Sequence, residues 1–115
     1  MKRLTIAIGN YGLTKALKDG TVKPPRLELD YVEIEPVTKA MRRMVRGMEF
    51  DICEMAFTTY LCAKALGAEI TAVPVFLTRN FHHWAAFYNV KSGIRAPRDL
   101  EGRRVAVNRG YTDRK

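Results

Sequence analysis

The sequence predicts an α/β domain of three layers built on a mostly parallel sheet. Short apolar runs rich in β-branched residues alternate with stretches whose apolar residues recur at helical spacing. The chain has 115 residues, of which 47% are hydrophobic and 28% are charged. That size and composition are sufficient to bury a core, so we expect residues 1–115 to form a single α/β lobe.

The first half of the chain indicates two strand–helix pairs. Residues 4–9, LTIAIG, are apolar at both alternating positions, as in a strand that is buried on both faces. A short helical segment follows and is expected to end at Gly20. A second strand is expected within residues 26–35, RLELDYVEIE, and Pro36 then opens a helix over Val37–Met48 with apolar residues at helical spacing.

The second half predicts a third strand–helix pair and three further strands. Residues 50–57, FDICEMAF, form the strand, and the threonines at 58 and 59 are expected to cap a helix that Gly67 ends. A fourth strand is expected at residues 69–76, near a sheet edge because it contains Pro74, and a fifth at residues 84–90. A one-turn helix at Pro97–Leu100, a turn at Gly102 and a sixth strand at Val105–Asn108 complete the expected fold.

Charge and cysteine content limit the kinds of partner. Twenty Lys and Arg against twelve Asp and Glu leave a net charge of +8, which favours anionic partners, whether nucleic acid, lipid head groups or small acids. The basic residues are scattered as doublets, so we do not expect nucleic acid as a partner. Cys53 and Cys62 are predicted to be buried free thiols. The short apolar run before Gly9 predicts neither a signal peptide nor a membrane anchor, so a cytoplasmic location is expected.

Polar and aromatic residues gather where the predicted strands end. In open α/β sheets, ligands bind beyond the carboxyl ends of the strands, so this edge is the expected binding site. The residues placed there are Asn10, Tyr11, Glu54, Thr58, Thr59, Arg79, His82, His83, Arg109, Tyr111 and Thr112.

Three blocks of sequence resemble one known family. They are FDICEMAFTTYL (50–61), AVPVFLTRNFHH (72–83) and SGIRAPRDLEGRRVAVNRGY (92–111). In order and spacing they are similar to the 4,5-dihydroxyphthalate decarboxylase group, which is related in fold to the type II periplasmic substrate-binding proteins. The last block is common to many binding proteins of this fold, whereas the first two are more specific to the decarboxylases.

The resemblance implies one lobe of a two-lobed protein whose ligand lies in the cleft between the lobes. Residues 1–115 are then expected to be the N-terminal part of a longer chain, with a truncated gene product and a fragment as open alternatives. The implied ligand is a small anionic aromatic acid, and the implied reaction is that of a carbon–carbon lyase that uses no organic cofactor.

Removal of an aromatic carboxylate requires a cation for the acid groups and a proton donor for the ring carbon. Arg79 is the candidate cation, because its planar guanidinium pairs with a carboxylate through two hydrogen bonds; a surface ion pair is the alternative. His83 is the candidate proton donor. Adjacent residues of an extended segment point in opposite directions, so only one of His82 and His83 should face the cleft, and the resemblance favours His83. A packed, hydrogen-bonded histidine is the alternative.

The remaining candidates are expected to bind or assist. Glu54 is either a general base or an ion-pair partner of Arg79. Thr58 and Thr59 offer hydroxyls and free backbone N–H groups to an anion at a helix start. No metal is expected, since adjacent histidines rarely bind one ion together. The expected ligand contacts are Asn10, Tyr11, Thr58, Thr59, Arg79, His82, Tyr111 and Thr112.

Three functions fit these observations. The first is an aromatic acid decarboxylase, the second is a small-anion binding protein of the same fold, and the third is an inactive truncated product. A proton donor that faces the ligand carbon is needed only by the enzyme. In each case a single lobe would expose the apolar surface between the lobes, so we expect it to form a homo-oligomer.

Overall fold

A computed structural model describes residues 1–106 of the chain, apart from the side chains of His82 and Trp84. The chain divides into two compact units, Met1–Thr78 and Arg79–Lys115. The first unit contains the sheet and the three α-helices, and the second contains three 3₁₀ helices.

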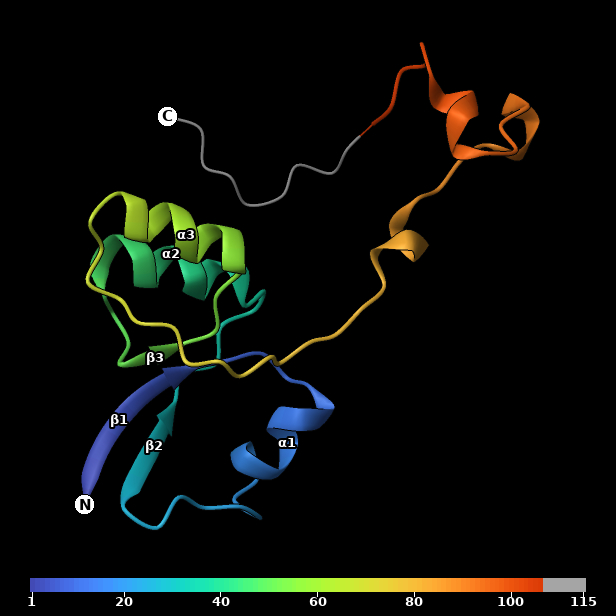
Figure 1. Ribbon diagram of the computed structural model, residues 1–115. Helices are drawn as coiled ribbons and strands as arrows, with labels where there is room; N and C mark the ends of the chain where they lie inside the picture. Colours follow the sequence, from blue (N-terminus) through green and yellow to red (C-terminus); the bar gives the residue numbers. More distant parts are fainter. Residues whose placement is uncertain (107–115) are drawn as a thin grey trace. The chain divides into compact units, whose positions relative to one another are not determined.

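The first unit is built on a three-stranded parallel sheet. Strand β1 (Lys2–Ala7) lies in the centre, β2 (Leu27–Tyr31) on one side and β3 (Ile52–Cys53) on the other. Ile6 is opposite Tyr31 of β2 and Ile52 of β3, so all three strands end at the same edge of the sheet (Figure 1). The predicted α/β class with a parallel sheet is confirmed.

Helices cover both faces of this sheet. Helices α2 (Thr38–Gly47) and α3 (Phe57–Ala65) lie on one side, and α1 (Gly12–Lys18) lies on the other (Figure 1). Because β1 is covered on both faces, its last residues and the next one, Ile6 to Ile8, are buried without polar alternation. The boundaries of α2 and α3 differ from the predicted ones by one or two residues. Gly20 and Gly67 adopt the positive φ angles of 78° and 85° expected after helix ends.

The core lies between the sheet and the pair α2 and α3. It consists of small residues and a few large ones: Ala7, Ala40, Met44, Phe50, Ala63 and Ile70. The alanines allow helix and sheet backbones to approach closely, while the larger side chains fill the remaining space. Met41 and Met44 of α2 are buried, whereas Met48 is exposed at the end of this helix.

The predicted fourth and fifth strands are absent from the described residues. A strand forms only where a neighbour accepts its backbone hydrogen bonds, and residues 69–76 have no such neighbour within residues 1–106. Pro74 has no N–H, and the N–H of Val75 donates instead to the carbonyl of Val73 at 2.7 Å, which closes a local turn.

The predicted sixth strand is described only in its first half. Val105 and Ala106 lie in no strand, and the other two residues of that prediction, 107 and 108, lie outside the described part of the chain. Within residues 1–106 the sheet therefore has three strands.

Two further local predictions are wrong. Helix α3 begins at Phe57 with Ala56 as its N-cap, so Thr58 and Thr59 lie inside the first turn and do not cap it. Cys62 is exposed on α3, because the core side of that helix is taken by Ala63, while Cys53 is half-buried. Both thiols are free, as predicted.

The described part of the second unit, residues 79–106, consists of 3₁₀ helices joined by irregular segments. They are η1 (His82–Ala85), η2 (Val90–Ser92) and η3 (Pro97–Leu100). The last of these is the predicted one-turn helix: Asp99 accepts hydrogen bonds from the backbone N–H groups of Arg95 and Ala96 at 2.7 and 2.9 Å, which fixes the start of the turn. Gly102 follows with a φ of 71°, which confirms the predicted turn.

The described part of the chain, residues 1–106, includes no helix of the length and apolar character needed to cross a bilayer.

Replacement of a core aromatic residue should destabilise the first unit far more than replacement of an exposed one. Phe50 is 6% exposed and packs in the core, whereas Phe57 is 70% exposed. We expect Phe50→Ala to lower the free energy of unfolding by about 3 kcal/mol through loss of burial and formation of a cavity. Phe57→Ala should change it by less than about 0.5 kcal/mol. Urea unfolding followed by circular dichroism measures both, and equal losses would contradict this core.

Candidate active site

The loop after β1 and the segment after β3 meet at the carboxyl edge of the sheet. The N–H of Glu54 donates to the carbonyl of Ala7 at 2.9 Å, which extends the β1–β3 pairing by one residue beyond β3. This bond places Glu54 beside the loop of residues 8–11, which connects β1 to α1. A residue that ends one strand is thereby positioned to contact the loop that follows the neighbouring strand.

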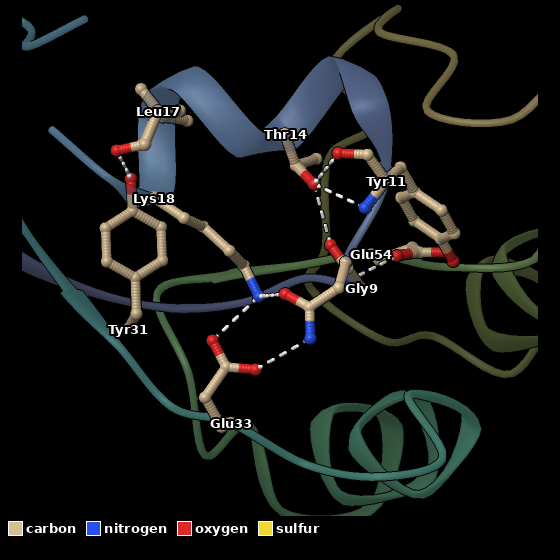
Figure 2. Close-up of polar contacts among 9 residues, drawn as sticks. Gly9, Tyr11, Thr14, Leu17, Lys18, Tyr31, Glu33 and Glu54 are labelled. Carbon is tan, nitrogen blue, oxygen red and sulfur yellow. Dashed lines mark hydrogen bonds and ion pairs between the residues drawn. The ribbon is translucent and has the colours of Figure 1, made fainter. Parts of the chain in front are cut away.

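Both carboxylate oxygens of Glu54 accept hydrogen bonds from this loop. The N–H of Gly9 donates to Oε2 at 2.8 Å, and the phenol of Tyr11 donates to Oε1 at 2.7 Å (Figure 2). Hydrogen bonds to an ionised acceptor are short and strong, particularly where water is partly excluded. Glu54 therefore fixes the backbone at Gly9 and the ring of Tyr11 at the same time.

Tyr11 is held as a neutral hydrogen-bond donor. Burial raises the pKa of its phenol to about 12, and the hydrogen bond to Glu54 and the negative charges of Glu54 and Glu35 act in the same direction. The ring lies so close to Gly9 that a Cβ atom at that position would be 2.6 Å from it. Only glycine allows the backbone and the ring to approach in this way.

Thr14 provides a second fixation of the same loop. It lies in the first turn of α1, is 2% exposed, and its hydroxyl oxygen accepts a hydrogen bond from the N–H of Tyr11 at 2.9 Å. The hydroxyl also donates to the carbonyl of Gly9, likewise at 2.9 Å (Figure 2). The start of α1 and the end of β1 are thus joined through one buried side chain.

A separate polar cluster lies at the ends of β1 and β2. Nζ of Lys18 donates to Oδ1 of Asn10 at 2.8 Å and to Oε1 of Glu33 at 2.7 Å (Figure 2). The amide nitrogen of Asn10 is 3.4 Å from Oε2 of Glu33, which is long for a hydrogen bond. The hydrogen bond from Lys18 is the main cause that lowers the pKa of the Glu33 carboxyl group, so this side chain stays ionised.

The thiol of Cys53 is adjacent to this edge but is not activated. Burial raises its pKa to about 11, and the negative charge of Glu54 adds to the effect. A thiol with such a pKa stays protonated at neutral pH and is a poor nucleophile.

The structure brings together some of the predicted site residues of the first unit. Tyr11 and Glu54 are in direct contact, and Asn10, next to Tyr11 in the loop, contacts Lys18. In the first turn of α3, Thr58 is exposed and Thr59 is half-buried.

The other predicted residues belong to the second unit or lie beyond the described part of the chain. Arg79 and His83 are exposed. The extended segment from which His82 and His83 were predicted to point in opposite directions is not formed, because both residues lie in the 3₁₀ helix η1. The side chain of His82 and the whole of residues 109, 111 and 112 (Arg109, Tyr111 and Thr112) lie outside the described residues.

Four residues of this edge escaped sequence reasoning: Gly9, Thr14, Lys18 and Glu33. The position of Thr14 was detectable, because a polar side chain three positions after the N-cap of a helix can bond back to the N–H of the cap. Lys18 and Glu33 are fifteen positions apart, and no spacing rule predicts their 2.7 Å contact. Among residues whose side chains the structure describes, no three His, Cys, Asp or Glu side chains are grouped to hold a metal ion.

Removal of the Tyr11 phenol should give a pH-dependent loss of stability. At neutral pH we expect Tyr11→Phe to lower the free energy of unfolding by about 1–2 kcal/mol, because a half-buried carboxylate loses its donor. The pKa of Tyr11 is raised from 10.0 to about 12 in the folded protein. The stabilisation is therefore fully present below pH 10 and is lost as the pH rises from 10 to about 12. Urea midpoints of both proteins should converge over that interval, and a difference that is independent of pH would refute the assignment.

Comparison with known proteins agrees with the resemblance described above. The family model described as NMT1/THI5 like matches residues 25–114. A 4,5-dihydroxyphthalate decarboxylase from Comamonas testosteroni is 34% identical over 106 residues, which cover 91% of this chain and 32% of the relative. A protein of the same name from Pseudomonas putida is 33% identical over 105 residues, which cover 90% of this chain and 40% of that relative.

The chain thus spans about a third of the first of these relatives and two fifths of the second. No solved structure matches it. The parallel α/β architecture is that expected for a lobe of the type II periplasmic-binding-protein-like fold, with which the matched family is consistent. The chain belongs to the NMT1/THI5-like family.

Proposed function

We propose that the protein decarboxylates a hydroxylated aromatic dicarboxylate such as 4,5-dihydroxyphthalate. The observation that carries this proposal is the similarity of nine tenths of the chain to two proteins named for that activity, at 34% and 33% identity. The net charge of +8 also suits a ligand with two acid groups.

In the proposed reaction, one bond between the ring and a carboxylate breaks and carbon dioxide leaves. The electron pair of that bond stays with the ring, and a proton takes the place of the carboxylate on the ring carbon. The proton reaches the ring carbon before the bond to the carboxylate breaks, and a hydroxyl group ortho or para to this carbon helps the ring to accept it. Arg79 is assigned the role of binding the acid groups, and His83 that of donating the proton.

The first unit offers hydrogen-bond donors and a rigid edge to a ligand. The amide of Asn10 can donate hydrogen bonds, and Thr58 and Thr59 can do so through their hydroxyls. The phenol of Tyr11 already donates its one proton to Glu54, so Tyr11 can contact a ligand through its ring or as an acceptor. As a general base, Glu54 would have to give up the hydrogen bond from Tyr11. Its two contacts favour the role of holding the loop between β1 and α1.

The remaining ligand contacts are assigned from sequence alone, partly through the family resemblance. They are His82, Tyr111 and Thr112, whose place at the ends of predicted strands is the other ground for the assignment.

A second candidate function is the binding of a small anion without catalysis. The matched family also includes binding proteins, and exposed cations such as Arg79 suit an anion in either case. The two functions differ in one respect, since only the enzyme needs a proton donor at the ring carbon. A cytoplasmic location is part of the proposal for both.

Two substitutions in the second unit test the decarboxylase in the protein expressed from its complete gene. We expect His83→Gln to lower kcat for carbon dioxide release from 4,5-dihydroxyphthalate by about 100-fold with little change in KM, since it removes the proton donor. Arg79→Lys should raise KM by about tenfold, because lysine keeps the charge but lacks the planar fork.

Arg95→Lys, at an exposed arginine of the same unit, is the matched control and should leave both constants unchanged. Calorimetry with the same compound detects binding independently of turnover. A wild-type protein that binds the acid without releasing carbon dioxide would support the anion-binding function and exclude the decarboxylase.

The chain is also proposed to form a homo-oligomer. Helix α3 and the residue after it expose Phe57, Leu61 and Leu66, which would be shielded from water by a second copy. Light scattering of residues 1–115 should give a mass above 13.1 kDa that rises with concentration, and Leu61→Lys should shift it toward the monomer. A monomer at every concentration would count against self-association.

A further inference from the structure

The cluster of Asn10, Lys18 and Glu33 has unused hydrogen-bonding capacity at the ligand edge of the sheet. Asn10 follows β1 and Glu33 follows β2, and these strands are parallel with Ile6 opposite Tyr31, so both residues leave the sheet at its carboxyl edge. Ligands of open α/β sheets bind at this edge. The phenol of Tyr31 donates to the carbonyl of Leu17 at 3.0 Å and so holds the end of α1 against β2 (Figure 2).

Lys18 is the enclosed member of the cluster and Glu33 is the open one. The side chain of Lys18 is 13% exposed and that of Glu33 is 57% exposed. Two of the three N–H groups of Lys18 bond to Asn10 and Glu33. The Glu33 carboxylate has about four acceptor positions, and apart from the bond to Lys18 the described residues offer it the 3.4 Å contact with Asn10.

The charges of this cluster select the kind of group that can bind there. Lys18 and Glu33 neutralise each other, and the exposed member is the anion, so a carboxylate of a ligand would be repelled by Glu33. A hydroxyl group both donates and accepts. Placed beside both groups, it could accept a hydrogen bond from the amide of Asn10 and donate one to Oε2 of Glu33, whose direct contact with each other is long.

We propose that Asn10, Lys18 and Glu33 form a subsite for the hydroxyl groups of an aromatic ligand, with Glu33 as the main acceptor. Lys18 is a positioning residue that keeps the carboxylate ionised and directed toward Asn10. The subsite rests on the proposed function in so far as the ligand is the dihydroxy acid, and it would explain how a dihydroxylated ring is distinguished from an unsubstituted one.

Binding to three ring compounds tests the subsite in the protein expressed from its complete gene. Isothermal titration calorimetry with 4,5-dihydroxyphthalate, phthalate and catechol should show that the wild-type protein prefers 4,5-dihydroxyphthalate to phthalate. Glu33→Gln should weaken binding of 4,5-dihydroxyphthalate by about tenfold through loss of a charged acceptor, with no change for phthalate. Asn10→Ala should reduce the same preference.

Glu28→Gln is the matched control, because it removes the same charge from an exposed position in β2 away from the carboxyl edge. An equal effect of Glu33→Gln and Glu28→Gln, or an equal loss for phthalate and its dihydroxy derivative, would overturn the subsite. So would a wild-type protein that shows no preference for the hydroxylated ring or binds none of the three compounds.

The outcomes separate this subsite from the decarboxylase. Preference for hydroxylated rings that depends on Glu33, without release of carbon dioxide, would support the subsite and refute the enzyme. Release of carbon dioxide with no effect of Glu33→Gln on binding would support the enzyme and overturn the subsite.

Discussion

The candidate site depends on the carboxylate of Glu54. It is the one side chain in the described residues that joins the end of β3 to the loop between β1 and α1, through hydrogen bonds of 2.8 Å to Gly9 and 2.7 Å to Tyr11. The close approach of the Tyr11 ring to Gly9 and the raised pKa of the phenol accompany this attachment. Thr14 reinforces it from the side of α1. A loop that is fixed from two directions loses little conformational entropy when a ligand binds to it.

The same arrangement explains how an edge that carries Glu54 and Glu33 could accept the anionic ligand proposed above. Each of these two carboxylates accepts hydrogen bonds from nearby groups. Glu54 accepts them from the N–H of Gly9 and the phenol of Tyr11, and Glu33 accepts one from Lys18. These donors satisfy both carboxylates within the first unit, and the net charge of +8, which already counts both glutamates, favours anionic ligands. An uncompensated glutamate at the same place would oppose binding of an acid.

Sequence reasoning predicted the elements that depend on a few neighbouring residues. It failed for elements that form only when distant segments of the chain pair. The apolar run of β1, the helical spacing of α2 and the turn at Gly102 each reflect a few neighbouring residues, and all three were predicted. Residues 69–76 have strand-like composition, yet a strand also needs a neighbour to accept its hydrogen bonds, and composition does not supply one. Within the site, Tyr11 and Glu54 were predicted because strand ends converge on one edge. Lys18 was not, since its role arises from the packing of α1 beside β2.

The chemistry of the side chains also separates the two tasks that a decarboxylase of a dihydroxy acid must perform. Binding the acid groups requires a cation with free donors, which excludes Lys18, because most of its N–H groups already bond to Asn10 and Glu33. Recognition of hydroxyl groups requires an acceptor, which suits Glu33 and excludes Arg79, because a guanidinium has no acceptor atom. A ring with acid groups on one side and hydroxyls on the other can therefore place only its hydroxyl side at the Glu33 cluster. Under the proposed function, that constraint would fix the orientation of the ring, so recognition of the hydroxyls would contribute to the choice of the bond that breaks.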